Sequence, residues 1–148
     1  MKWEEGASVD AAATPAAVWH VLLDGPRWGE WNDGVEWLWF EGVPATRTLA
    51  TIKPKRMRQT AFIVETLEPE RFFGLLLRFG PVAALRLEWR LTPIPTGTRI
   101  DGCVTIDGVA ARFLTGTAMK IAAAMPVTLA QLAARAAEKS ASVSGRAS

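Results

Sequence analysis

Apolar and polar residues alternate along much of the chain, which is the pattern of strands with one buried and one solvated face. The alternation is clearest late in the chain, where four large apolar side chains share one face and three charged side chains share the other: Leu85, Leu87, Trp89 and Leu91 against Arg86, Glu88 and Arg90. Read in this way, the pattern predicts seven strands, at residues 2–10, 35–41, 46–53, 58–67, 71–79, 83–93 and 98–107. From the second strand onward the connections are short turns, so consecutive strands should be antiparallel neighbours.

Two short helices are predicted between the first and second strands. Thr14 can cap the first helix, and Pro15 stands at its first position, where a missing N–H costs nothing. The helix should end at residues 24–26, which read Asp-Gly-Pro. A second short helix or turn is predicted at residues 26–31.

The last predicted element is a long, alanine-rich helix over residues 109–138. Its apolar residues form one stripe, made of Leu114, Ala118, Ile121, Met125, Leu129 and Leu132. Pro126 lies in the middle and deletes one helical hydrogen bond, which predicts a kink there. Residues 140–148 are small and polar without periodicity, so we expect a disordered tail behind a single domain of residues 1–139.

Composition excludes several classes of protein. The chain has 148 residues, 22% of them charged, and a net charge of +2, which favours neither nucleic-acid binding nor stable membrane insertion. With one cysteine and one histidine, neither an intramolecular disulfide nor a His/Cys metal cluster is expected, and no cofactor is predicted. The N-terminus lacks the apolar region of a signal peptide, and the apolar stretch 121–134 is short and interrupted, so a cytoplasmic location is expected.

The order of the predicted elements defines a fold class. A sheet with one solvated face needs a cover on its other face, and the C-terminal helix is the one element long enough to provide it. The sequence therefore predicts an α+β fold in which a curved antiparallel sheet of about seven strands wraps a long C-terminal helix, a layout that resembles the helix-grip fold.

Four segments resemble those of one superfamily. They are Thr14–Trp19 (TPAAVW), Trp28–Asn32 (WGEWN), Glu65–Phe72 (ETLEPERF) and Gly97–Ile100 (GTRI). In this order they are similar to segments of the START-like helix-grip superfamily, which includes polyketide cyclase/dehydrase-like (SRPBCC-type) and pollen-allergen-like proteins. The resemblance runs from Trp3 to about Glu138. One departure is Pro44-Ala45, where members of the superfamily often carry Pro-Gly.

The resemblance implies a ligand cavity between the concave sheet face and the long helix. Ten residues are candidates for contacting a ligand there: Trp28, Trp31, Phe62, Leu75, Leu77, Leu87, Trp89, Met119, Ile121 and Met125. Trp28 and Trp31 would lie near the cavity mouth, either as an aromatic wall or as packing anchors of the short helix. A filled core without a ligand remains the alternative.

The leading functional hypothesis is binding of a hydrophobic small molecule, such as a lipid, a polyketide or an aromatic metabolite. The alternative is a cyclase-, aromatase- or dehydratase-type enzyme that uses the same cavity, which would need an ionisable side chain turned inward. The candidates are predicted to face water instead: Arg78, Arg86, Glu88, Arg90 and His20. Cys103 has no base placed beside it, so no catalytic residue is predicted.

Two surface features leave a partner possible. A protein partner would need an exposed apolar patch, which the sequence offers only in the tryptophan-rich segment 28–40. A basic hairpin carries Lys53, Lys55, Arg56 and Arg58. It is either an ordinary solvated hairpin tip or a dock for an anionic partner or a phospholipid head group.

Overall fold

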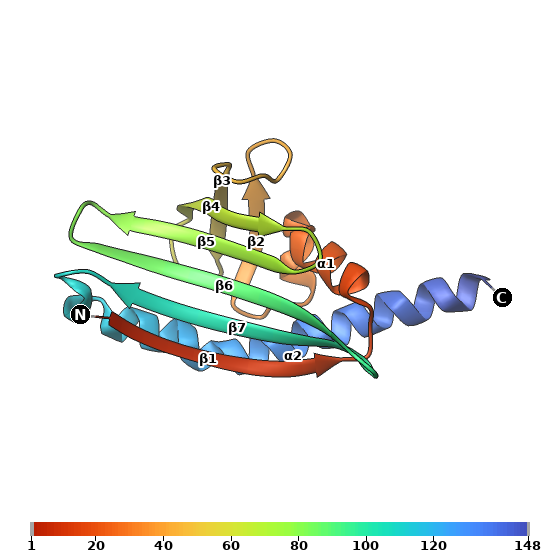
Figure 1. Cartoon of the computed structure of the whole chain (residues 1–148). Coiled ribbons are helices and arrows are strands. Elements are labelled where there is room, and N and C mark those ends of the chain that lie inside the picture. The colour runs from red at the N-terminus through yellow and green to blue at the C-terminus, as the bar shows by residue number, and fades with distance from the viewer. Residues whose placement is uncertain (1, 148) are drawn as a thin grey trace.

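The protein forms one seven-stranded antiparallel sheet that curls around a long helix (Figure 1). This computed structural model describes residues 2–147, and side chains as far as residue 141. The strand order is β1-β7-β6-β5-β4-β3-β2. The elements are β1 (Lys2–Ala11), α1 (Pro15–Leu23), the 3₁₀ helix η1 (Gly25–Glu30), β2 (Val35–Phe40), β3 (Leu49–Pro54), β4 (Thr60–Glu68), β5 (Phe72–Phe79), β6 (Ala83–Ile94), β7 (Gly97–Asp107), the 3₁₀ helix η2 (Ala111–Phe113) and α2 (Thr115–Ala147).

The predicted helix-grip fold is confirmed, with both short helices between the first two strands. Thr14 caps α1 as expected, because its Oγ1 accepts a hydrogen bond from the N–H of Ala17 at 3.2 Å. The largest error in a strand is at β3, which was expected to begin at residue 46 and begins at Leu49. Arg47 takes a left-handed φ of 74°, and this conformation interrupts an extended strand.

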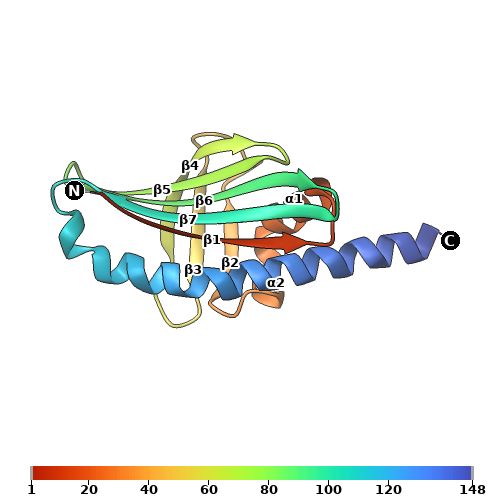
Figure 2. The same ribbon diagram turned by 60° about the horizontal axis from the view of Figure 1, so that its bottom comes forward.

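The long helix begins six residues later than predicted, because Gly108 (φ 115°) and the 3₁₀ turn η2 precede it. α2 then runs without interruption through Pro126 as a gently bowed helix beneath β1 and β7 (Figure 2). It continues past residue 140. The side chains of 142–148, most of the predicted disordered tail, lie outside the described residues.

α2 packs closely against β7 at Gly102. A Cβ placed there would lie 2.7 Å from the Sδ of Met125 and 3.3 Å from a methyl carbon of Leu129. The segment Thr115–Ala141 is long and apolar enough to cross a membrane by length and composition alone. In this structure it is instead the helix that covers the sheet, with Leu129 and Leu132 fully buried.

η1 is held against β2 by two glycines. A Cβ on Gly25 would lie 2.1 Å from the carbonyl oxygen of Leu38, and a Cβ on Gly29 would lie 2.4 Å from that of Glu36. Side chains at either position would therefore push η1 away from the strand. Because of this close approach, the side chain of Trp28 extends into the interior of the sheet, where it is 2% exposed.

The convex face of the sheet carries the charged residues, as alternation predicts. Arg86 lies between two carboxylates, with its Nε 2.8 Å from Glu65 Oε1 and its Nη1 2.8 Å from Asp107 Oδ2. The hydrogen bond that Arg86 donates to Glu65 is the main cause that raises the pKa of Arg86 above its ordinary value, so this guanidinium stays charged.

Candidate ligand-binding site

The concave face of β2–β7 is apolar. The register of the strands places fifteen aliphatic and aromatic side chains on it, each 8% exposed or less: Leu38, Phe40, Ala50, Ile52, Phe62, Val64, Phe73, Leu75, Leu85, Leu87, Trp89, Leu91, Ile100, Val104 and Ile106. Four of the predicted ligand residues, Phe62, Leu75, Leu87 and Trp89, therefore point inward as expected. This surface offers hydrophobic contact and little else.

A cluster of aromatic side chains fills the end of the interior next to α1 and η1. Phe73 stacks on Trp89 with ring centroids 5.5 Å apart, and Trp28 meets the edge of Trp89 at 5.9 Å. Trp31 lies 5.4 Å from Trp28, and Phe40 lies 5.9 Å from Phe73. We call these five residues the aromatic cluster.

The expected position of Trp28 and Trp31 at a cavity mouth is wrong. Trp28 is 2% and Trp31 is 8% exposed, and the indole Nε1–H of Trp28 donates to the carbonyl oxygen of Leu22 at 2.9 Å. This bond satisfies the one polar group of a buried indole. The two tryptophans thus pack inside the fold, because η1 lies very close to β2.

The remaining predicted residues lie around the first half of α2. Met125 is 5% exposed, whereas Ile121 on α2 and Leu77 on β5 are half-buried. Both half-buried side chains pack against the core. Leu77 and Ile121 are therefore the partly exposed members of this predicted set that still pack against the core.

Met119 does not belong to this site. It is 54% exposed, so the expectation that it meets the sheet is wrong. In the first part of α2 the buried side is formed by Ala118, Ala122 and Met125. Met119 follows Ala118, and one helical step of about 100° turns its side chain toward solvent.

The ionisable candidates lie outside the interior. His20, Arg78 and Arg90 are exposed, while Arg86 and Glu88 stand on the convex face. Among the described residues, the concave face carries few polar side chains: Thr60 opposite Ile52, Thr98, and Glu5 on the exposed edge strand β1. Thr98 is fully buried, and its hydroxyl donates to the carbonyl oxygen of Ala13 at 2.7 Å.

Cys103 also lies on the convex face, beside Thr105 with Sγ and Oγ1 3.8 Å apart. Partial burial is the main cause that raises the pKa of its thiol. A raised pKa lowers the fraction of thiolate and opposes a nucleophilic role. Across residues 2–141, no group of three His, Cys, Asp or Glu side chains is placed to hold a metal ion.

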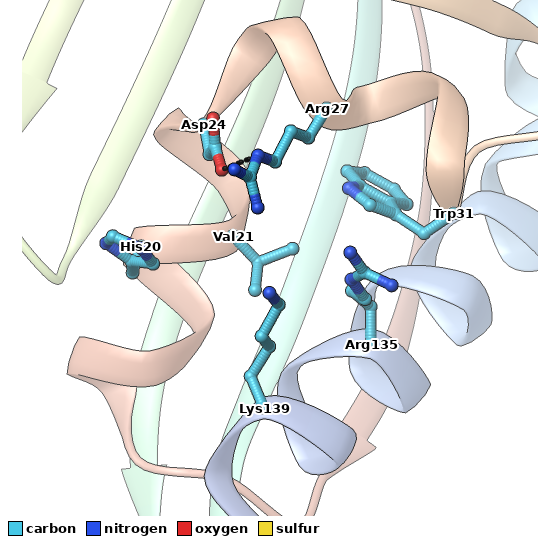
Figure 3. A pocket seen from close by; sticks show the side chains of 7 residues that line it. All are labelled: His20, Val21, Asp24, Arg27, Trp31, Arg135 and Lys139. Atoms are coloured by element: carbon cyan, nitrogen blue, oxygen red, sulfur yellow. Dashed lines mark ion pairs between the residues drawn. The ribbon is translucent and has the colours of Figure 1, made fainter. Parts of the chain in front are cut away.

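Two surface hollows lie outside the sheet. The alternation of apolar and polar residues could not predict either of them, because each is formed by segments that are far apart in the sequence. One is a small pocket of about 10 Å³ between α1, η1 and α2, where Arg27, Arg135 and Lys139 approach Val21 (Figure 3). Its size suits a single water molecule.

The second hollow is an open groove of about 590 Å³. It runs along the start of α1, the β4–β5 turn and the end of β6, and it is lined by Thr14, Pro15, Ala16, Glu68, Pro69, Glu70, Arg71, Arg90, Leu91, Thr92 and Pro93. Its acidic and basic side chains are mixed, so it favours no single charge of ligand.

Several solved structures share this fold. The di-domain ARO/CYC StfQ from the steffimycin biosynthetic pathway has a TM-score of 0.72 at 14% identity; the match covers 94% of this chain but 52% of that one, so this chain spans about half of it. Protein NE0264 from Nitrosomonas europaea has a TM-score of 0.70 at 14% identity, with 93% and 96% covered. The Zhui aromatase/cyclase from Streptomyces sp. R1128 has a TM-score of 0.65 at 16% identity, with 92% and 94% covered.

Similarity in sequence defines the family more directly. No curated protein sequence matches the chain. The profile of the family described as polyketide cyclase / dehydrase and lipid transport matches residues 6–137, which is nearly the whole folded domain. The chain belongs to this polyketide cyclase / dehydrase and lipid transport family.

Proposed function

We propose that the protein binds a hydrophobic small molecule, such as a lipid, a polyketide or an aromatic metabolite, between the concave sheet face and α2. The observation that carries this proposal is the apolar concave face, whose strands β2–β7 turn no ionisable side chain inward among the described residues. Such a surface gains free energy from apolar contact, about 25 cal/mol for each Å² removed from water.

The site is narrower than the whole interior. The aromatic cluster occupies the end next to η1, and the contact of Met125 with Gly102 brings α2 onto β7. We therefore propose that the ligand lies toward the start of α2, against Leu77, Leu87 and Ile121. Met125 would also contact it, and its flexible thioether can adapt to ligands of different shape.

The family and its relatives support a ligand of this class. The family description names lipid transport beside cyclase and dehydrase chemistry, and two structures of the same fold are aromatase/cyclases by name. Because identity to these structures is 14–16%, they support the fold alone, and neither the position nor the identity of the ligand follows from them.

A cyclase-type reaction in the same interior is the second candidate function, favoured by these named relatives. It would rely on orienting a reactive chain in an apolar space, because among the described residues the concave face of β2–β7 carries the hydroxyls of Thr60 and Thr98 but no ionisable side chain. Product analysis after incubation with a linear poly-β-ketone would test it. Products identical to those formed without protein would exclude cyclisation and leave ligand binding standing.

A pair of neighbouring alanines on α2 allows a matched test of the binding site. Ala122 is 6% exposed and faces the interior, whereas Ala123 is exposed. Leucine at 122 should fill the space beside Ile121 and Met125, so Ala122→Leu should weaken binding at least tenfold. Ala123→Leu, with the same change in composition, should bind as the wild type does.

The assay is titration with a panel of fatty acids and polycyclic aromatic compounds, followed by quenching of tryptophan fluorescence and by native mass spectrometry. Circular dichroism confirms that both variants fold. The proposal fails if no compound binds the wild type, or if the two leucine variants bind equally well.

A further inference from the structure

The tip of the β3–β4 hairpin carries an unusual concentration of charge. Lys55, Arg56 and Arg58 are all exposed, and none of them has an ion-pair partner among the described residues. Lys53 differs, because its Nζ lies 3.6 Å from Glu36 Oε2. Between the three cations stands Met57, which is 66% exposed. The tip thus presents three uncompensated positive charges around one apolar side chain.

The outward face of α2 is apolar, and after Lys120 it carries no charge as far as Arg135. Across Thr115–Ala141 the helix is apolar enough to cross a membrane, yet only 33% of its most apolar window is buried. Met119 and Val127 are 54% and 56% exposed, and Ala123 and Ala130 lie on the same exposed side. Between Lys120 and Arg135 this helix has no charged residue. An exposed apolar face of this kind is typical of a surface that contacts a membrane or another protein.

The hairpin tip and α2 meet at the same turn, Asn32–Gly34. The N–H of Lys55 donates to the carbonyl oxygen of Gly34 at 3.2 Å. Asp33 is bonded to Gln131 of α2, whose Nε2 donates to Asp33 Oδ2 at 2.7 Å. Figure 2 shows the hairpin that follows β3 projecting past α2 on the side where the helix lies. The basic tip and the uncharged helix face are therefore parts of one surface.

We propose that this surface, formed by residues 55–58 and the outward face of α2, docks on an anionic lipid bilayer. The three cations suit the phosphate groups of anionic lipids, and Met57 and Val127 suit the boundary between head groups and acyl chains. A nucleic acid would be matched by the cations alone and would leave the apolar helix face in water.

The first test compares two variants of equal charge. Lys55→Gln/Arg56→Gln/Arg58→Gln removes the cations of the tip, whereas Arg47→Gln/Arg71→Gln/Arg90→Gln removes three exposed cations elsewhere. Flotation with vesicles of phosphatidylcholine, with and without phosphatidylglycerol, measures binding without any internal ligand. Wild type should bind the anionic vesicles, less tightly as salt rises. The tip variant should lose about 100-fold in affinity, and the control variant less than about threefold.

Three results would overturn the proposal: no binding of wild type to anionic vesicles, equal losses in both triple variants, or stronger binding to a single-stranded polynucleotide than to the vesicles. Because flotation needs no ligand in the interior, its failure is separate from a failure of the proposed ligand binding.

A second test locates the contact on the bilayer. With Cys103→Ser as background, Met57→Cys carries an environment-sensitive NBD label at the tip, and Val43→Cys carries it in the β2–β3 loop, where Val43 is 85% exposed. Anionic vesicles should shift the emission of the label at 57 to the blue and leave the label at 43 unchanged. Equal shifts at both positions, or no shift at 57, would contradict docking through this surface.

Discussion

Replacing Gly25 by alanine should destabilise the protein by displacing η1 from β2. The new Cβ would lie 2.1 Å from the carbonyl oxygen of Leu38, whereas real Cβ contacts essentially never fall below 3.0 Å. The obstructing atom belongs to the backbone of a strand, so η1 has to move. That movement pulls Trp28 from its hydrogen bond to Leu22 and from its contact with Trp89.

The expected cost combines two effects. Overpacking against a rigid neighbour costs about 1–3 kcal/mol, and the loss of a buried hydrogen bond costs about 1 kcal/mol more. We expect Gly25→Ala to lower the free energy of unfolding by about 3 kcal/mol, a large share of the roughly 5–15 kcal/mol of a typical domain. Urea unfolding, followed by far-UV circular dichroism and tryptophan fluorescence, measures it.

Gly34→Ala is the matched control for this substitution. The nearest atom to its added Cβ is Asn32 Oδ1 at 3.6 Å, which is an ordinary contact. The control should stay within about 0.5 kcal/mol of wild type. If Gly25→Ala costs less than about 1 kcal/mol, or no more than Gly34→Ala, then η1 is not held by this contact and the placement of Trp28 has another cause.

Three further predictions concern the rest of the sheet. Thr98→Val should lower the free energy of unfolding by about 1–3 kcal/mol, because it leaves the carbonyl oxygen of Ala13 without its partner; a neutral result in urea would contradict this bond. Arg86→Met should lower the free energy of unfolding by about 1 kcal/mol, because the two carboxylates that pair with Arg86 are partly solvated. This loss of stability should become smaller at high salt, and a loss that does not depend on salt would refute the electrostatic explanation. The raised pKa of Cys103 means less thiolate, so at pH 8 its reaction with Ellman's reagent should be slower than that of glutathione; an equal or faster rate would contradict it.

Alternation predicted the sheet well because each strand has one buried and one solvated face. In β6 the four residues predicted to share the apolar face, Leu85, Leu87, Trp89 and Leu91, are all buried as expected. The start of β3 was missed for a local reason. Arg47 has a positive φ, and this conformation is difficult to predict from sequence at a residue other than glycine.

The site was harder to predict than the sheet. The inward direction of Leu75, Leu87 and Trp89 followed from period two, and these positions are confirmed. The burial of Trp28 depends on how closely η1 approaches β2, which is a tertiary contact. Gly25 and Gly29, four residues apart, were the available signal, but glycines in a short helix are as typical of a turn.

The two ends of the interior differ in the side chains that fill them, and this difference limits the size of ligand that the proposed site can hold. Near η1 the aromatic cluster is closed by stacked rings, such as Phe73 on Trp89, and by the hydrogen bond of Trp28. Near the start of α2, the methionine, leucine and isoleucine side chains that would contact the proposed ligand change rotamer easily. In the proposed site a large ligand could be accommodated only if the first half of α2 moved away from the sheet, because the aromatic cluster already fills the other end. The outward face of that same half-helix is part of the proposed docking surface, so contact with a bilayer and opening of the interior would act on one element.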